Sequence, residues 1–208
     1  YFKLGLPKGK WMLPFVAIAI MLLLTPVNDW ITYWNEGLDL GSSGDEFRRM
    51  SNESKKIVDL MLSLNGGWDL ALQLFVVALV PAVCEELFFR GCFQQVMQKW
   101  TKNAHAAIVV TAVLFSLAHG DVFGFVPRLV LGLLLGYFFY LSGSILVNIC
   151  AHFFNNALIV VLYYLYHNGI LLSAPDSPLM MPWLTTCLCA LAAIALFVIY
   201  FAKPQKND

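Results

Sequence analysis

The sequence predicts an all-α fold, namely a polytopic membrane helical bundle of about six transmembrane segments. Of its 208 residues, 60% are hydrophobic and 12% are charged, whereas an average soluble domain carries about 25% charged residues. The mean hydropathy is +0.72, and the apolar residues gather in stretches close to the roughly 20 residues that cross a bilayer. Such a composition excludes an ordinary soluble domain and a disordered chain.

The first predicted span covers residues 11–27. Its Pro14 falls in the first turn, where proline is tolerated. A polar stretch over residues 28–68 follows. Within it, residues 44–64 have the pattern of an amphipathic helix, which we expect to pack on the surface of the bundle or at the membrane interface.

Five more apolar stretches complete the predicted bundle. They cover residues 70–98, 104–119, 123–141, 144–166 and 181–202. The stretch over 123–141 contains Pro127 and several glycines, which predicts a broken or re-entrant span. The sequence shows no internal repeat.

Basic residues predict the orientation of these spans. They lie before the first span, after the second and after the sixth, as Lys3, Lys8, Lys10, Lys99, Lys102, Lys203 and Lys206. The opposite loops carry Asp121, Asp176 and the net-acidic stretch 28–68. Because cytoplasmic loops are rich in lysine and arginine, both ends of this chain are expected in the cytoplasm. The start at Tyr1 suggests a missing upstream piece, and the zero net charge gives no reason to expect a nucleic-acid partner.

Ionisable residues inside apolar spans are costly and are functional candidates by default. The second span contains Glu85, Glu86 and Arg90. Glu86 and Arg90 are four residues apart, so they share a helix face and are expected to pair. Glu85 lies about 100° around the helix and need not share that arginine. An unpaired carboxylate at such depth suits a general base.

His119 ends the third span, and the fifth contains His152 and Asn156, four residues apart on one face. Each set alone has a structural explanation. Arg90 could neutralise one carboxylate while the other reaches water, and an imidazole with an amide could join two helices. Counted from the neighbouring turns at ~1.5 Å per residue, however, the four candidate site residues lie at roughly 14–24 Å. We therefore expect Glu85, His119, His152 and Asn156 to meet in one layer of the membrane.

The ordered motifs carry a family resemblance. They are Glu85-Glu86-Leu87-Phe88-Phe89-Arg90, Phe115-Ser116-Leu117-Ala118-His119 and His152-Phe153-Phe154-Asn155-Asn156. As Glu-Glu-x-x-x-Arg, Phe-x-x-x-His and His-x-x-x-Asn, they resemble the CAAX-protease and bacteriocin-processing (CPBP) intramembrane proteases. That family includes the type II CAAX prenyl endopeptidases of eukaryotes and the bacterial Abi proteins. The resemblance covers about residues 70–166.

The resemblance implies a role for each matching residue. Glu85 would be the general base that activates water, and His119 would hold the same water. His152 and Asn156 would face the oxyanion of the tetrahedral intermediate. Glu86 and Arg90 would form a supporting pair. Imidazole and amide donors can stabilise developing negative charge, so these roles are physically consistent.

Metal dependence stays open at this stage. Glu85, His119 and His152 could form a three-ligand zinc site with an open position. The sequence has no His-Glu-x-x-His motif, and the amide of Asn156 would be a poor zinc ligand. We favour a mechanism without a cofactor, in which glutamate activates the water, and keep zinc as the alternative.

Two classes of function fit these residues. The first is an intramembrane endopeptidase that cleaves a peptide or membrane-protein substrate in a lipid bilayer, which the resemblance places in a bacterial plasma membrane. The second is a non-proteolytic membrane module, either a proton-coupled transporter or an interaction partner, because buried glutamates and histidines also relay protons. The predicted organisation is a first span plus polar loop (1–68), a protease core (69–166) and a last span with a polar tail (167–208). Nothing in the sequence selects a substrate.

Overall fold

The computed structural model describes residues 5–6, 9–41, 44–63, 66, 68–173, 175 and 180–201. Within these residues the chain is helical and has no strand, which confirms the predicted all-α class. The helices, with π- and 3-10 segments labelled η, are α1 (Leu13–Glu36), α2 (Gly44–Leu62), α3 (Asp69–Gln73), η2 (Leu74–Leu79), α4 (Val80–Phe88), η3 (Phe89–Phe93), α5 (Gln94–Thr101), α6 (Ala104–Leu117), η4 (Val122–Gly124), α7 (Phe125–Ser142), α8 (Ile145–His167) and α9 (Trp183–Tyr200).

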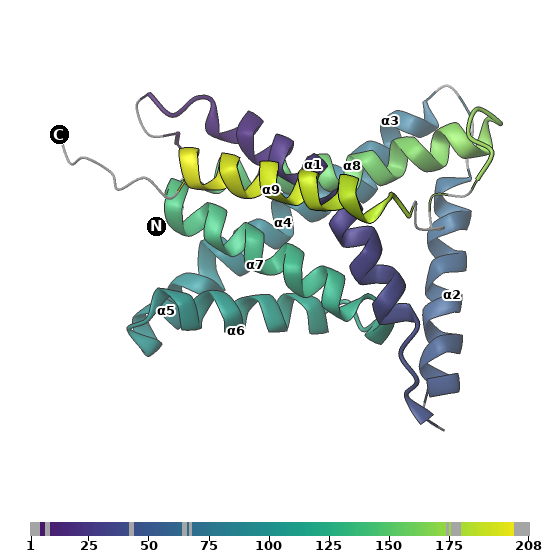
Figure 1. Cartoon of the computed structure of the whole chain (residues 1–208), viewed down its shortest axis with the longest axis horizontal. Helices are drawn as coiled ribbons and strands as arrows, with labels where there is room; N and C mark the ends of the chain where they lie inside the picture. Colours follow the sequence, from purple (N-terminus) through teal and green to yellow (C-terminus); the bar gives the residue numbers. More distant parts are fainter. Residues whose placement is uncertain are drawn as a thin grey trace.

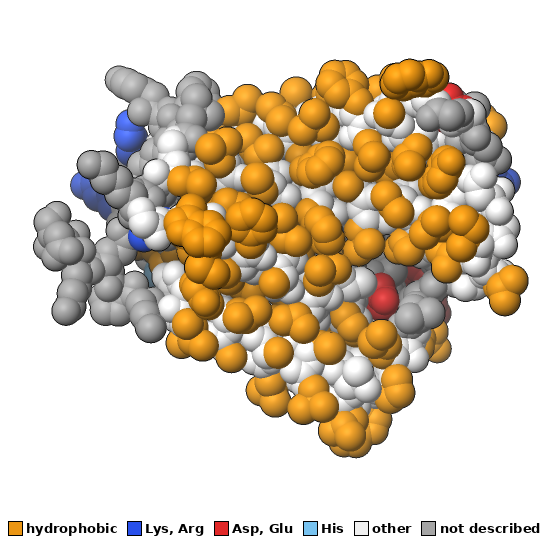
Figure 2. All heavy atoms as spheres, turned by 90° about the horizontal axis from the view of Figure 1, so that it is seen from above, with side chains coloured by type: hydrophobic (Ala, Val, Ile, Leu, Met, Phe, Trp, Pro, Cys, Tyr) orange, Lys and Arg blue, Asp and Glu red, His pale blue; other side chains and the backbone are white. Residues whose placement is uncertain are grey.

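Five helical stretches are long and apolar enough to cross a membrane. They are Leu13–Glu36, Asp69–Thr101, Val122–Ser142, Ile145–His167 and Trp183–Tyr200. The third predicted span, residues 104–119, corresponds to α6, which is apolar but has only 14 residues. Hydrophobic side chains cover most of the face seen in Figure 2, and the lysine and arginine side chains visible there lie at its ends. The chain is therefore an integral membrane protein with a polytopic helical bundle.

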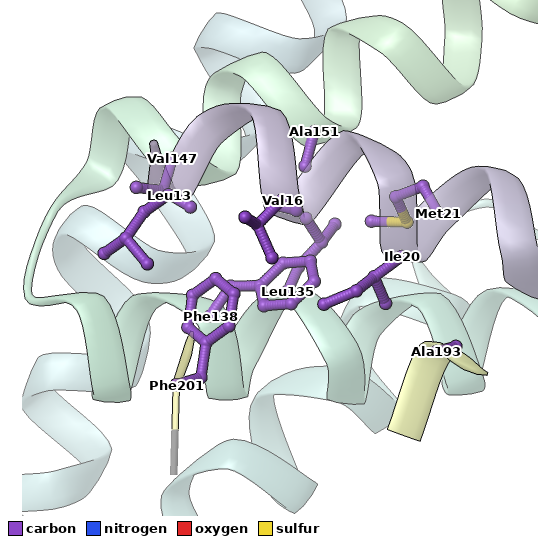
Figure 3. Packing of buried hydrophobic residues seen from close by; sticks show 11 residues of the cluster. Leu13, Val16, Ile20, Met21, Leu135, Phe138, Val147, Ala151, Ala193 and Phe201 are labelled. Carbon is purple, nitrogen blue, oxygen red and sulfur yellow. The ribbon is translucent and has the colours of Figure 1, made fainter. Parts of the chain in front are cut away.

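Helix α1 lies at the centre of the apolar core. Its Leu13, Val16 and Ile20 are buried and belong to one cluster with Leu135 and Phe138 of α7 (Figure 3). Val147 and Ala151 of α8 join the cluster, as do Ala193 of α9 and the following Phe201. These contacts tie the first and last helices of the chain to the segments that carry the polar motifs.

Two sequence expectations are wrong in detail. Helix α1 does not end at residue 27 but continues through Pro26 to Glu36, so the first nine residues of the expected polar stretch are helical. The expected interruption at Pro127 is also absent, because this proline lies in the first turn of α7, where its missing N–H needs no partner. Lys3, Lys8, Asp176, Lys203 and Lys206, which entered the orientation argument, lie outside the described residues.

The second predicted span is one long helix interrupted by two π-helical segments. Segment η2 directly precedes α4, in which Pro81 cannot donate a backbone hydrogen bond. Segment η3 follows the two glutamates and contains Arg90. Such segments widen the helix locally and occur often at functional sites. Here they flank the nine residues of α4, which carries Glu85 and Glu86.

Candidate active site

A buried ion pair lies at the centre of the polar network. Arg90 Nη1 donates to Glu86 Oε1 at 2.6 Å, and both side chains are fully buried. This is the pairing that the four-residue spacing predicts. Arg90 Nη2 also donates to the carbonyl oxygen of Gly132 at 2.9 Å, and the guanidinium lies 4.8 Å from the centroid of the Phe115 ring. Burying these charges is tolerable only because each has a close partner.

Glycines of α7 make room for these contacts. A Cβ on Gly132 would lie 3.1 Å from the Cα of Ala112, and one on Gly136 would lie 2.7 Å from Cγ2 of Ile108. Both distances are too short for ordinary packing, so glycine allows α7 to approach α6 closely. The same two residues offer carbonyl oxygens to the second span. Gly132 accepts from Arg90, and Gly136 accepts from Gln94 Nε2 at 3.1 Å.

Asn148 is a member of the network that the sequence analysis missed. Its Nδ2 donates to Glu86 Oε2 at 3.0 Å and to the carbonyl oxygen of Leu135 at 2.6 Å, and the side chain is fully buried. It lies one helical turn before His152 on α8. That spacing was visible in the sequence, because residues 148, 152 and 156 form one polar row along a mostly apolar helix.

His152 connects the two glutamates. Its Nδ1 lies 2.8 Å from Glu86 Oε1, and its Nε2 lies 3.8 Å from Glu85 Oε2. The side chain is only 3% exposed. Since Arg90 and Asn148 stabilise Glu86 as a carboxylate, we assign the Nδ1 proton to the bond with Glu86. Glu86 thus fixes the tautomer and orientation of the ring, and Nε2 faces Glu85.

The two adjacent glutamates have different surroundings. Glu86 is fully buried and bonded on both oxygens, whereas the Glu85 side chain is 29% exposed. Within the part of the chain that the structure describes, Glu85 Oε2 is buried and makes no hydrogen bond. The 3.8 Å to His152 Nε2 is too long for a hydrogen bond between them. An oxygen atom within ~2.8 Å of each could contact both groups.

His119 reaches this region through an aromatic contact. It follows the end of α6, is exposed, and its Nδ1 lies 2.8 Å from the carbonyl oxygen of Phe115. The rings of His119 and His152 both pack against the Phe115 ring, with centroid separations of 5.0 and 5.9 Å. Phe115 therefore lies between the two histidines and under the guanidinium of Arg90. Phe115, the aromatic residue of the Phe-x-x-x-His motif, therefore packs between the side chains of the three motifs.

Asn156 is less closely connected. It lies one turn beyond His152 on α8 and is partly buried. Among the described residues, its side chain has one hydrogen bond, from Asn155 Nδ2 to Asn156 Oδ1 at 3.4 Å. The structure thus brings together Glu85, Glu86 and His152, with His119 and Asn156 at the edge of the group.

A three-ligand metal site is not assembled by these side chains. No group of three His, Cys, Asp or Glu side chains within the described segments is arranged to hold a metal ion. Glu85 and His152 face one another, but His119 does not complete the set of ligands. The choice between a site without a cofactor and the zinc site of Glu85, His119 and His152 therefore stays a prediction.

Comparison with protein families gives a match to the part of the chain that carries the three motifs. Residues 67–158 match the family described as type II CAAX prenyl endopeptidase Rce1-like. The matched segment contains all three motifs and confirms the resemblance that they indicated. No curated protein and no solved structure matches the chain.

Proposed function

We propose, from the match of residues 67–158 to the type II CAAX prenyl endopeptidase Rce1-like family, that this chain is an intramembrane protease in which Glu85 and His152 activate water for peptide-bond hydrolysis. The match supports a CAAX-type intramembrane protease in general. The residue roles are our proposal. The substrate would be a peptide or a membrane protein.

One observation carries this assignment. Glu85 Oε2 and His152 Nε2 face one another at 3.8 Å. Glu86 orients the His152 ring through its contact with Nδ1. A general base must lie within hydrogen-bond reach of the proton that it removes, and a water between these atoms would satisfy that condition. The alternative, a proton-coupled transporter, would need a polar path across the membrane, and no observation here favours it.

The hydrolysis proceeds in two steps. Glu85 removes a proton from water, and the oxygen attacks the carbonyl carbon of the scissile peptide bond to form a tetrahedral oxyanion. Glu85 then transfers this proton to the leaving nitrogen, the C–N bond breaks, and the products are a carboxylic acid and an amine. The one carboxylate acts first as base and then as acid, so no other proton donor is needed.

His152 contributes differently in its two protonation states. When neutral, its Nε2 accepts a hydrogen bond and helps to orient the water, because the proton is on Nδ1. A His152 that is already protonated when substrate binds donates Nε2–H to the oxyanion instead, with its charge stabilised by Glu86, and it neither gains nor loses a proton during the reaction. His119 would hold the same water from the end of α6. Asn156, one turn from His152, would donate its amide hydrogen to the oxyanion as substrate binds.

Substrate trapping tests the proposed activity. Glu85→Gln keeps the shape of the side chain but removes the base, so uncleaved substrate should accumulate in membranes that contain the variant. Mass spectrometry compares these membranes with those containing the wild type and a matched control, Glu46→Gln, which changes an exposed glutamate of α2. Identical polypeptide profiles for all three would contradict a protease and favour a non-proteolytic module.

Chelation tests the choice of mechanism separately. Protein extracted in mild detergent should keep its peptidase activity after prolonged treatment with a strong chelator, if Glu85 and the histidines hold the water unaided. A catalytic zinc would be lost, and activity would return only when metal was added. Stoichiometric zinc by elemental analysis, lost and restored together with activity, would refute the metal-free mechanism.

A further inference from the structure

Helix α2 is divided lengthwise into three faces. At about 100° per residue, each face takes roughly a third of the circumference. The first faces the bundle, the second carries exposed apolar side chains, and the third carries exposed charged side chains. We call the second the apolar row, and its members are Phe47, Met50, Ile57 and Met61, which are 40%, 49%, 61% and 46% exposed.

The bundle-facing side of α2 is fixed by polar contacts. Lys55 Nζ forms an ion pair with Glu36 Oε1 at 2.5 Å, at the end of α1. The guanidinium of Arg48 lies 4.4 Å from the centroid of the Phe123 ring, in η4. Asp59 Oδ1 lies 3.2 Å from His167 Nε2, at the end of α8. Three contacts to three elements set the rotation of α2 about its own axis and therefore the direction of the apolar row.

The apolar row and the charged face of α2 differ in the side chains that they expose. Ser54, the one polar side chain within the apolar row, donates its hydroxyl to the carbonyl oxygen of Met50 at 3.0 Å. That bond satisfies the hydroxyl without water. The third face exposes Arg49 and Glu53, whose side chains are 70% and 65% exposed, and it also exposes Leu60, at 72%. An amphipathic helix with such faces is typical of the interface between lipid and water.

Exposed tryptophans near α2 indicate that this helix lies at the level of the lipid headgroups. In Figure 1, α2 crosses the end of the bundle at which α1 ends and at which α3 and α9 begin. Those ends carry Trp30, Trp34, Trp68 and Trp183, all exposed. Trp30 Nε1 also donates to the carbonyl oxygen of Met181 at 3.2 Å, which joins the end of α1 to the start of α9. Exposed tryptophans gather at the level of lipid headgroups.

We infer that α2 lies in the membrane interface, with the apolar row inserted among the lipids of the bilayer that the bundle spans. The charged face is then turned to water, and the first face stays against the bundle. The acidic and basic side chains of α2 are equal in number, four of each, so apolar insertion rather than attraction to anionic lipid holds the helix there.

Quenching by brominated lipid tests this inference. The full chain is reconstituted in nanodiscs of phosphatidylcholine, with or without bromine near the headgroup end of the acyl chains. An environment-sensitive fluorescent amino acid replaces Met50, Ile57 or, as the matched control on the charged face, the exposed Lys56. Leu188, 59% exposed on α9, is the control for insertion of the bundle. Quenching at Met50 and Ile57 should be at least about twofold that at Lys56.

Three other results of the quenching experiment would overturn the inference. Equal quenching at Met50, Ile57 and Lys56 would mean that the apolar row does not enter lipid. Blue-shifted emission at Met50 without bromine quenching would mean that protein covers the row, either a second copy or a partner. Absence of quenching even at Leu188 would overturn the inference together with the membrane assignment on which it rests.

Discussion

Two arginine–glutamate pairs with the same four-residue spacing occur in very different surroundings. Glu86 and Arg90 are 0% exposed and 2.6 Å apart in the second span. Arg49 and Glu53 on α2 are 70% and 65% exposed and 4.0 Å apart. Water solvates the second pair whether or not the pair forms, but only protein can solvate the first. The comparison teaches that sequence spacing predicts which side chains can pair, while burial decides how much depends on the pair.

The largest effect is expected from Arg90→Ala. It leaves the Glu86 carboxylate buried without its cation, which costs about 3–5 kcal/mol in comparable cases. We expect low yield and a clearly lower melting temperature in detergent. Arg49→Ala is the matched control on α2 and should change stability by no more than about 0.5 kcal/mol. Wild-type yield and melting temperature for Arg90→Ala would show that the buried pair does not support the fold.

A smaller loss is expected from Asn148→Ala. The substitution removes the donor to Glu86 Oε2 and to the carbonyl oxygen of Leu135. A buried acceptor left without its partner costs about 1–3 kcal/mol, and Glu86 still keeps its bond to Arg90. Thermal unfolding should therefore show a loss between those of Arg90→Ala and Arg49→Ala. Asn148→Asp is a useful second variant, because it places a second carboxylate against Glu86 and should destabilise more than alanine does. The reverse order would contradict the assigned hydrogen bond.

The smallest effect is expected from Lys55→Ala. The Lys55–Glu36 pair is short, but its side chains are 43% and 29% exposed, and such pairs contribute about 0–1 kcal/mol. Any loss should shrink at high salt, because exposed charges are screened. A loss as large as that of Arg90→Ala would show that the junction between α1 and α2 is as important to the fold as the buried network.

Local spacing explains which features of this molecule were predictable. Apolar length predicted the spans, and the four-residue spacing of Glu86 and Arg90 predicted their pairing. The amphipathic pattern near residues 44–64 likewise predicted α2. Each depends on residues within a few turns of one helix.

The features that were missed depend on contacts between distant segments. That His152 Nδ1 bonds to Glu86 while Nε2 faces Glu85 is set by how α8 packs on α4, which no local pattern encodes. The closeness of α7 to α6 depends in the same way on Gly132 and Gly136. Continuation of α1 past Pro26 was missed because proline weakens a helix without always ending it. Asn148 was visible in the sequence, but its importance depends on the partner across the helix interface.

The central claim is that Glu85, and not its buried neighbour, activates the water. The direct measurement is the turnover of purified Glu85→Gln on a fluorogenic peptide that contains the cleavage site found by trapping, together with its melting temperature. We expect hydrolysis to fall by at least about 10²-fold while the melting temperature stays near that of the wild type, because Glu85 Oε2 makes no hydrogen bond among the described residues. Wild-type turnover by Glu85→Gln would contradict the account.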